Sequence, residues 1–227
     1  MNTTNRKTAV IVGVLFIIGT VAGILSAVFT GSTFSDPDYL IKVSENQTQI
    51  IIGALCVLIM GFALAMVPVM LFPIFKKHNE ALALGAVLFR GALEAFTYIA
   101  MVISWLLLIV LSQEYVKAGN PEISFFQTLG TLLLESGDWI NQILAIVFSL
   151  GALMIYYLFY QSKLIPRWLS IWGLVGGVLY LFVPLVGIFG PNVEILMVPL
   201  ALQEMVLAVW LIVKGFNLST NASKTTT

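Results

Sequence analysis

Long apolar runs separated by short polar clusters dominate the sequence. A helix rises 1.5 Å per residue, so about 20 apolar residues are needed to cross a hydrocarbon core about 30 Å thick. Six runs of roughly that length occur, each bounded by charged or turn-forming residues. We therefore predict an all-α, polytopic integral membrane protein. The six predicted transmembrane helices are 8–29, 50–75, 82–111, 139–160, 169–189 and 195–213.

The composition supports a membrane protein. Hydrophobic residues make up 59% of the chain and charged residues only 10%, and the mean hydropathy is +1.01, outside the range of soluble domains. The formal net charge is zero, so no basic surface favours nucleic acid, and we expect membrane lipid as the surrounding partner. The sequence gives no indication of a protein partner. We predict a single transmembrane domain over residues 1–227, with a polar, disordered tail at 217–227.

The basic residues predict an orientation, because short cytoplasmic loops carry an excess of lysine and arginine. With the N-terminus inside, the outer loops hold only Lys42 and Lys117, and all the other basic residues outside the spans are on the inner side. Both termini are therefore predicted to be cytoplasmic, in the plasma membrane. The inner basic residues are Arg6, Lys7, Lys76, Lys77, Lys163, Arg167, Lys214 and Lys224.

The segment between the third and fourth spans is too polar to cross the membrane and too apolar for a free loop. We predict that 121–136 forms an amphipathic helix lying at the outer interface. Such a helix either caps a cavity or only covers helix ends. Its apolar residues at helical spacing are Ile123, Phe126, Leu129, Leu133 and Leu134.

Small and aromatic residues indicate how the helices pack and where they end. Gly19 and Gly23, and likewise Gly173 and Gly177, have the four-residue spacing that lets helix backbones approach closely. Packing within the bundle is favoured over a dimer interface. Six aromatic residues near predicted span ends are expected to be interfacial anchors. They are Trp105, Tyr156, Tyr157, Tyr160, Trp168 and Trp172.

Three charged residues remain inside predicted spans. Arg90 and Glu94 lie one helical turn apart in the stretch FRGALEA, and Glu204 lies in the sixth span. A charge at mid-bilayer costs about 2.5–3.5 kcal/mol on insertion scales, so each needs a partner. Counted from the predicted cytoplasmic ends, their depths are roughly 12, 18 and 15 Å. We predict that the third and sixth spans pack together, that Arg90 bridges both carboxylates, and that Gln203 or Tyr98 completes the network.

This network permits several functions. One guanidinium cannot fully compensate two desolvated carboxylates, so we hypothesise that the pair shares a proton. The favoured interpretation is binding or transport of a small amphiphilic or anionic ligand at the Arg/Glu site. The alternatives are an ion pair that only joins two helices, an intramembrane lipid-modifying enzyme, and a structural or regulatory partner of another membrane protein. A possible outer cavity would be lined by Glu135, Asp138, Asn141 and Gln142.

Familiar catalytic and metal-binding motifs are absent from the sequence. His78 is the only histidine and Cys56 the only cysteine, so a Ser/His/Asp set or a multi-histidine metal site cannot be assembled. No glycine-rich phosphate loop opens a helix. We therefore predict no catalytic residues, no metal and no cofactor.

Three stretches carry a family resemblance: FRGALEA at 89–95, SKLIPRWLSIWGLVGG at 162–177, and WLIVKGFN at 210–217. In this order they resemble a bacterial family catalogued as domain of unknown function 4386. The resemblance covers almost the whole chain. It implies a small multi-span membrane protein of bacteria or archaea, and it implies no activity, substrate or catalytic residue.

Overall fold

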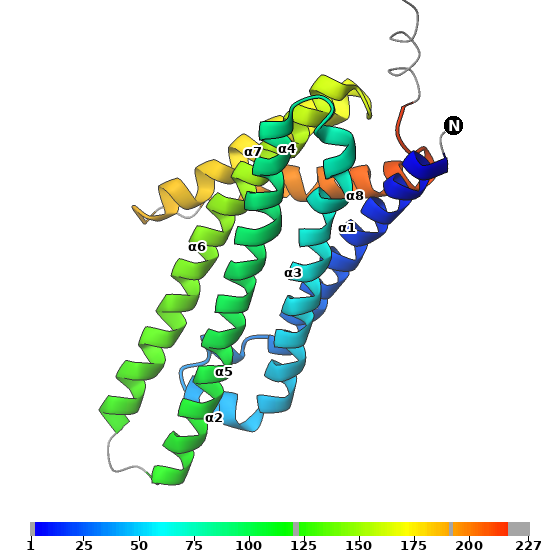
Figure 1. The fold of residues 1–227 in the computed structure, drawn as a ribbon. Coiled ribbons are helices and arrows are strands. Elements are labelled where there is room, and N and C mark those ends of the chain that lie inside the picture. The colour runs from blue at the N-terminus through cyan, green and yellow to red at the C-terminus, as the bar shows by residue number, and fades with distance from the viewer. Residues whose placement is uncertain (1–2, 120–122, 191–192, 218–227) are drawn as a thin grey trace, which may run out of the picture.

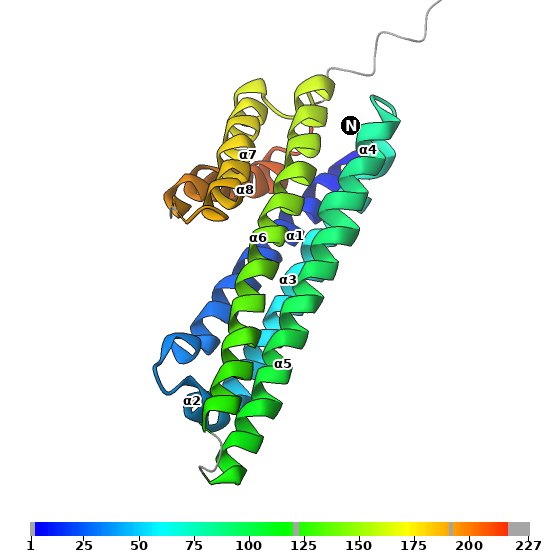
Figure 2. The ribbon, with the colours of Figure 1, turned by 90° about the vertical axis from the view of Figure 1, so that its left-hand side faces the viewer.

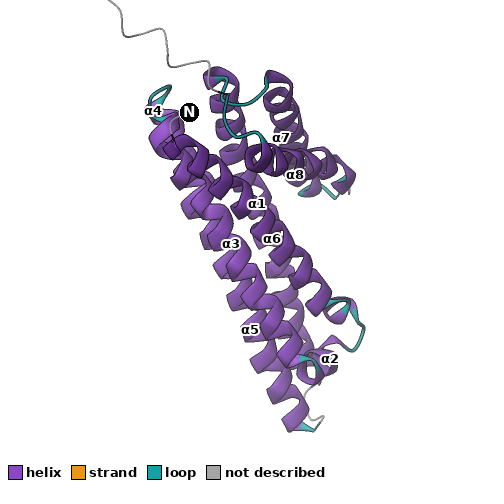
Figure 3. Ribbon diagram, turned by 90° about the vertical axis from the view of Figure 1, so that its right-hand side faces the viewer, coloured by secondary structure: helices purple, strands orange, loops and turns teal. Residues whose placement is uncertain are grey.

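Every regular element that the structure describes is a helix (Figure 3). The computed structural model describes residues 3–119, 123–190 and 193–217. Six helices in these ranges are long and apolar enough to cross a membrane. The prediction of an all-α, multi-pass membrane protein is confirmed. The six spanning segments are Asn5–Thr30, Gln47–Phe75, Glu80–Ala118, Ser124–Ser162, Arg167–Gly187 and Glu194–Val213.

Short turns separate the spans. Short helices lie between the first and second spans and form the first parts of the third and sixth spans. The elements in order are α1 (Thr3–Thr30), η1 (Thr33–Ser35), α2 (Tyr39–Glu45), α3 (Gln47–Phe75), α4 (Glu80–Ala86), η2 (Val87–Leu93), α5 (Glu94–Ala118), α6 (Ile123–Ser162), α7 (Arg167–Gly187), η3 (Glu194–Met197) and α8 (Val198–Val213).

A long antiparallel hairpin of α5 and α6 runs the length of the molecule (Figures 1 and 2). Helices α1 and α3 pack against each other, and α3 also packs against α5. The shorter α7 and α8 lie beside only one half of the hairpin, as Figure 2 shows, and α8 packs mainly against α1 and α7. The main hydrophobic core lies in that half and includes Phe16, Leu71, Ile155, Phe159 and Leu207.

The helix ends and turns that carry the predicted cytoplasmic basic residues lie at one end of the bundle, which we call the basic end. The start of α1, the α3–α4 turn and the α6–α7 turn all lie there (Figure 1). Arg6 of α1 donates hydrogen bonds to the carbonyls of Ile212 and Val213, at 2.7 and 3.2 Å, so the first and last helices meet at this end. Because consecutive spans run in opposite directions, alternate connections lie at the same end of the bundle. The basic clusters therefore lie together, as the sequence predicts.

The glycine pairs pack helices closely, as predicted. A Cβ atom built on Gly19 would lie 2.6 Å from a methyl carbon of Leu64, so α1 approaches α3 at this point. Gly173 faces the ring of Tyr156, and a Cβ on Gly177 would lie 2.9 Å from Leu153, so α7 approaches α6.

Two sequence predictions need correction. The segment predicted as a separate interfacial helix is helical from Ile123 onward, but it continues without a break into the fourth span as α6. Gly137 does not interrupt this helix, because it keeps helical geometry. Pro121 lies outside the described residues. At the other end, Asn217 belongs to the fold and not to a disordered tail, because its backbone N–H donates to the carbonyl of Leu164 at 2.7 Å. Residues 218–227 lie outside the described residues.

Candidate functional site

Arg90 lies in η2, a π-helical segment that joins α4 to α5. The wider π-helical turn is rare and is found frequently at functional sites in proteins. Helix α6 crosses close to this segment at Gly151, where an added Cβ would lie 2.6 Å from the backbone nitrogen of Arg90. The missing side chain of Gly151 therefore lets α6 approach the backbone that carries Arg90.

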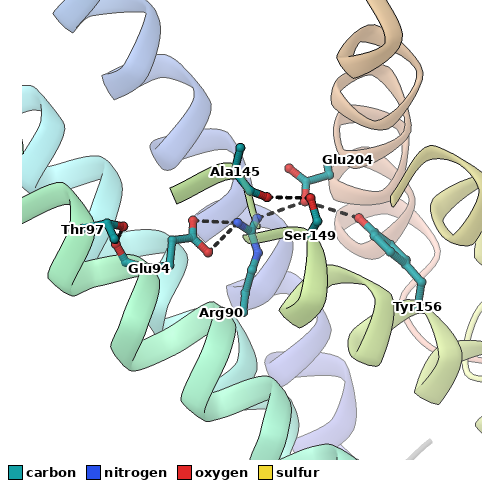
Figure 4. Close-up of polar contacts among 7 residues, drawn as sticks. All are labelled: Arg90, Glu94, Thr97, Ala145, Ser149, Tyr156 and Glu204. Carbon is teal, nitrogen blue, oxygen red and sulfur yellow. Dashed lines mark hydrogen bonds and ion pairs between the residues drawn. The ribbon is translucent and has the colours of Figure 1, made fainter. Parts of the chain in front are cut away.

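The guanidinium of Arg90 bridges two carboxylates from different spans (Figure 4). Its Nη1 lies 2.7 and 2.8 Å from the two oxygens of Glu94, and its Nη2 lies 3.0 Å from Oε1 of Glu204. Arg90 and Glu94 are each 1% exposed, whereas the side chain of Glu204 is 14% exposed. The predicted bridge is confirmed, and only its Glu204 end is partly open.

Two aromatic residues without a predicted role in the network, Phe148 and Tyr156, also contact it. The guanidinium carbon of Arg90 lies 4.0 Å from the ring centre of Phe148, a cation–π contact. The hydroxyl of Tyr156 lies 3.4 Å from Oε1 of Glu204 and donates a weak hydrogen bond to it. Tyr156 is 1% exposed, so the expectation that it anchors the protein at the interface is wrong. A tyrosine near a span end suits either place, and the close approach of α7 at Gly173 decides between them.

Of the two residues predicted to complete the network, Gln203 has another role and Tyr98 lies beside the network. The amide of Gln203 donates to the carbonyl of Leu169 at 3.0 Å and joins α8 to the start of α7. Tyr98 is buried with its ring against Gly61 of α3, and its hydroxyl interacts with the carboxylate of Glu94. The prediction that the third and sixth spans pack together needs correction, because α8 lies mainly against α1 and α7. The link between the two spans is made by the long side chains of Arg90 and Glu204.

A cavity of about 850 Å³ begins at the open side of this network. Glu204 and Tyr98 line it, and so do Asp138, Asn141 and Gln142 of α6. The inner charge network and the predicted outer cavity therefore belong to one continuous space. Glu135, the fourth residue predicted there, is exposed and is not part of the lining.

The walls of the cavity are mainly apolar and aromatic. Acidic residues lie both in its deep part and at its exposed part. Met60, Leu64, Phe148 and Val183 are among its wall residues. The charged residues in the described lining are all acids: Asp138, Glu194 and Glu204. Such a lining can hold an apolar chain and a polar or charged group together.

Comparison with known proteins gives a family without a described activity. The family described as Domain of unknown function (DUF4386) matches residues 11–215. No curated protein matches the chain, and no solved structure matches it.

Proposed function

We propose that this protein, which belongs to the family described as Domain of unknown function (DUF4386), binds a small amphiphilic molecule. The binding is reversible and takes place inside the membrane. The observation that carries this proposal is the cavity of about 850 Å³ next to the charge network. Its size falls within the range of about 300–1,000 Å³ that is common for small-molecule sites. Predominantly apolar walls with a few polar groups are also typical of such sites.

The arrangement of polar groups favours an amphiphile over a purely apolar molecule. Glu204 contributes a carboxylate deep in the cavity, about 14 Å from the end of α8 at Val213. Asp138 and Glu194 are exposed and lie at the mouth. Apolar side chains such as Leu64 and Val183 lie on the walls. An occupant with one polar group and one apolar part would therefore meet a suitable surface for each.

The charge network supports the cavity but does not offer an anion site. Both terminal nitrogens of Arg90 already bind carboxylates, and its face lies on Phe148. Arg90 is not among the lining residues. We assign it a positioning role: it holds Glu204 of α8 against η2. The anionic ligand considered from the sequence therefore gains no support.

A saturable binding measurement tests the proposal. The protein would be reconstituted in lipid nanodiscs of zwitterionic lipid and titrated with the neutral, solvatochromic dye Nile red. Ala201 lines the cavity and is exposed, so Ala201→Phe would fill the space. Its neighbour Leu202 is 55% exposed and is not a lining residue, so Leu202→Phe is the matched control.

We expect one saturable, blue-shifted Nile red site in the wild type and in Leu202→Phe, and its loss in Ala201→Phe. Non-saturable partition of the dye that is equal in all three proteins would overturn the proposal. Equal saturable binding in all three would place the dye elsewhere and would overturn it as well.

The proposal includes a location in the plasma membrane with the basic end in the cytoplasm. The support is the excess of lysine and arginine at that end. In this orientation the mouth at Asp138 opens toward the outer side.

A further inference from the structure

We infer that the cavity selects amphiphiles with a cationic head group, such as a long-chain ammonium, and holds that group beside Glu204. This inference rests on the proposed binding function and names the chemical class of the occupant. It follows from three independent features of the lining: its charges, the free side of the Glu204 carboxylate, and an unpartnered acceptor with aromatic neighbours.

The charges of the lining have one sign. Three acids line the cavity and no lysine or arginine is among its described residues. Two of the acids, Asp138 and Glu194, are exposed at the mouth. Acids at an entrance between low-dielectric walls raise the local concentration of cations and lower that of anions. The mouth therefore favours entry of a cationic head group.

The carboxylate of Glu204, a lining residue, has one oxygen engaged by hydrogen bonds. Arg90 and Tyr156 both donate to Oε1, at 3.0 and 3.4 Å. Among the described residues, Oε2 accepts no hydrogen bond. The side chain keeps 14% of its surface exposed although it lies deep in the bundle. A cation beside Oε2 would meet a carboxylate that the protein already holds in place, so little ordering would be lost on binding.

Acceptor and aromatic groups surround the same space. The amide oxygen of Gln142, a lining residue, is buried and has no hydrogen-bond partner among the residues that the structure describes. A buried acceptor without a partner costs roughly 1–3 kcal/mol, which a donor on the occupant would offset. The rings of Tyr98 and Tyr180 also line the cavity, and an ammonium group over an aromatic face is attracted to it. The same groups would disfavour an anion.

Competition between matched amphiphiles tests the selectivity. Nile red bound in zwitterionic nanodiscs would be displaced by decylammonium, decyl sulfate or decanol, which share one chain length and differ in head-group charge. We expect the ammonium to displace the dye at a concentration at least about tenfold below that of the sulfate, with decanol between them.

Three variants assign this preference to residues. Glu204→Gln removes the deep charge, and Asp138→Asn combined with Glu194→Gln removes the charges at the mouth. Glu135→Gln is the control, since Glu135 is an exposed acid on the same helix as Asp138 and outside the lining. We expect each lining variant to reduce the preference for ammonium about threefold or more, and Glu135→Gln to leave it unchanged.

The outcomes separate the inference from the proposed function. Saturable dye binding with equal displacement by ammonium and sulfate overturns the cationic class and leaves amphiphile binding in place. A preference that persists in both lining variants also overturns it. Failure of the dye to bind saturably overturns the proposed function itself. If Glu204→Gln does not fold, the mouth variant alone decides, because its two residues are exposed.

Discussion

At the scale of single residues, the buried charges show how one side chain can satisfy two helices. Arg90 has five N–H donors in a planar fork, which is why it can bind Glu94 and Glu204 with different nitrogens. A lysine at this position would offer a single ammonium centre. Arg90 is the only cation that binds Glu94 in the described residues, since both Glu94 oxygens bind Arg90 and Glu94 is only 1% exposed.

Replacement of Arg90 alone should therefore be far more harmful than replacement of all three charges. We expect Arg90→Met to lose about 3–5 kcal/mol of unfolding free energy, because two buried carboxylates are left without a cation. Arg90→Met combined with Glu94→Leu and Glu204→Leu should recover most of that loss. Thermal unfolding in mild detergent would measure both. A triple variant as unstable as the single one would mean that the charges are required for the fold.

At the scale of elements, the approach of α6 to η2 determines where Arg90 points. Gly151 is the contact point, and an added Cβ would meet the backbone of Arg90 and not a flexible side chain. No pattern in the sequence predicts this approach. The π-helical segment VLFRGAL has apolar residues that suit an ordinary α-helix, and the widening is seen only in the hydrogen-bond pattern. Local composition does not distinguish the two kinds of helix.

Two glycines of α6 provide a matched test of this contact. Gly151→Ala should cost about 2 kcal/mol, because the added carbon overlaps the backbone of Arg90 and α6 must move away. Gly137→Ala should be neutral or stabilising by up to about 1 kcal/mol, since nothing lies within 4 Å of its Cβ position. Melting temperatures of the two variants check this, and equal values would refute the contact.

The end of α8 depends on a side chain from α1. Arg6 donates to the carbonyls of Leu211, Ile212 and Val213, which have no partner in the following turn of a helix that stops here. Arg6→Gln should therefore lower stability by roughly 1–2 kcal/mol. Lys7→Gln, one residue along and exposed, should change it little. The comparison is informative in the same unfolding assay, and an equal loss in both would point to net charge instead.

At the scale of the whole molecule, the number of spans was predictable because hydrocarbon imposes a minimum length on an apolar helix. The bridge from Arg90 to Glu204 was predictable for a related reason, since a charge in hydrocarbon must find a partner. The continuous α6 was not predictable. The polar residues between 121 and 138 suggested a break, but polarity alone does not end a helix that extends beyond the apolar layer. The shared cavity of Glu204 and Asp138 also depends on how α7 and α8 lie, which local patterns do not specify.

Labelling of introduced cysteines can test the orientation in the membrane, because the chain has a single native cysteine. Cys56 is buried in α3 and should react slowly. We expect a membrane-impermeant maleimide to label Lys117→Cys in intact cells but to label His78→Cys only after the membrane is opened. Both positions lie at span ends outside the charge network. The reverse pattern would show that the basic end faces outward.

The length of α6 sets the distance between the lipid and anything that touches the tip of the hairpin. Its 40 residues extend about 60 Å, twice the thickness of the hydrocarbon core. Asp138 lies about 36 Å from the end of α6 at Ser162, so with Ser162 at one lipid surface the cavity mouth would lie near the other. The rest of the helix would then extend about 20 Å beyond that surface. A neighbouring protein or envelope layer that contacts this tip would therefore stay about 20 Å from the lipid surface. The gap between them would leave space for an amphiphile to reach the cavity mouth.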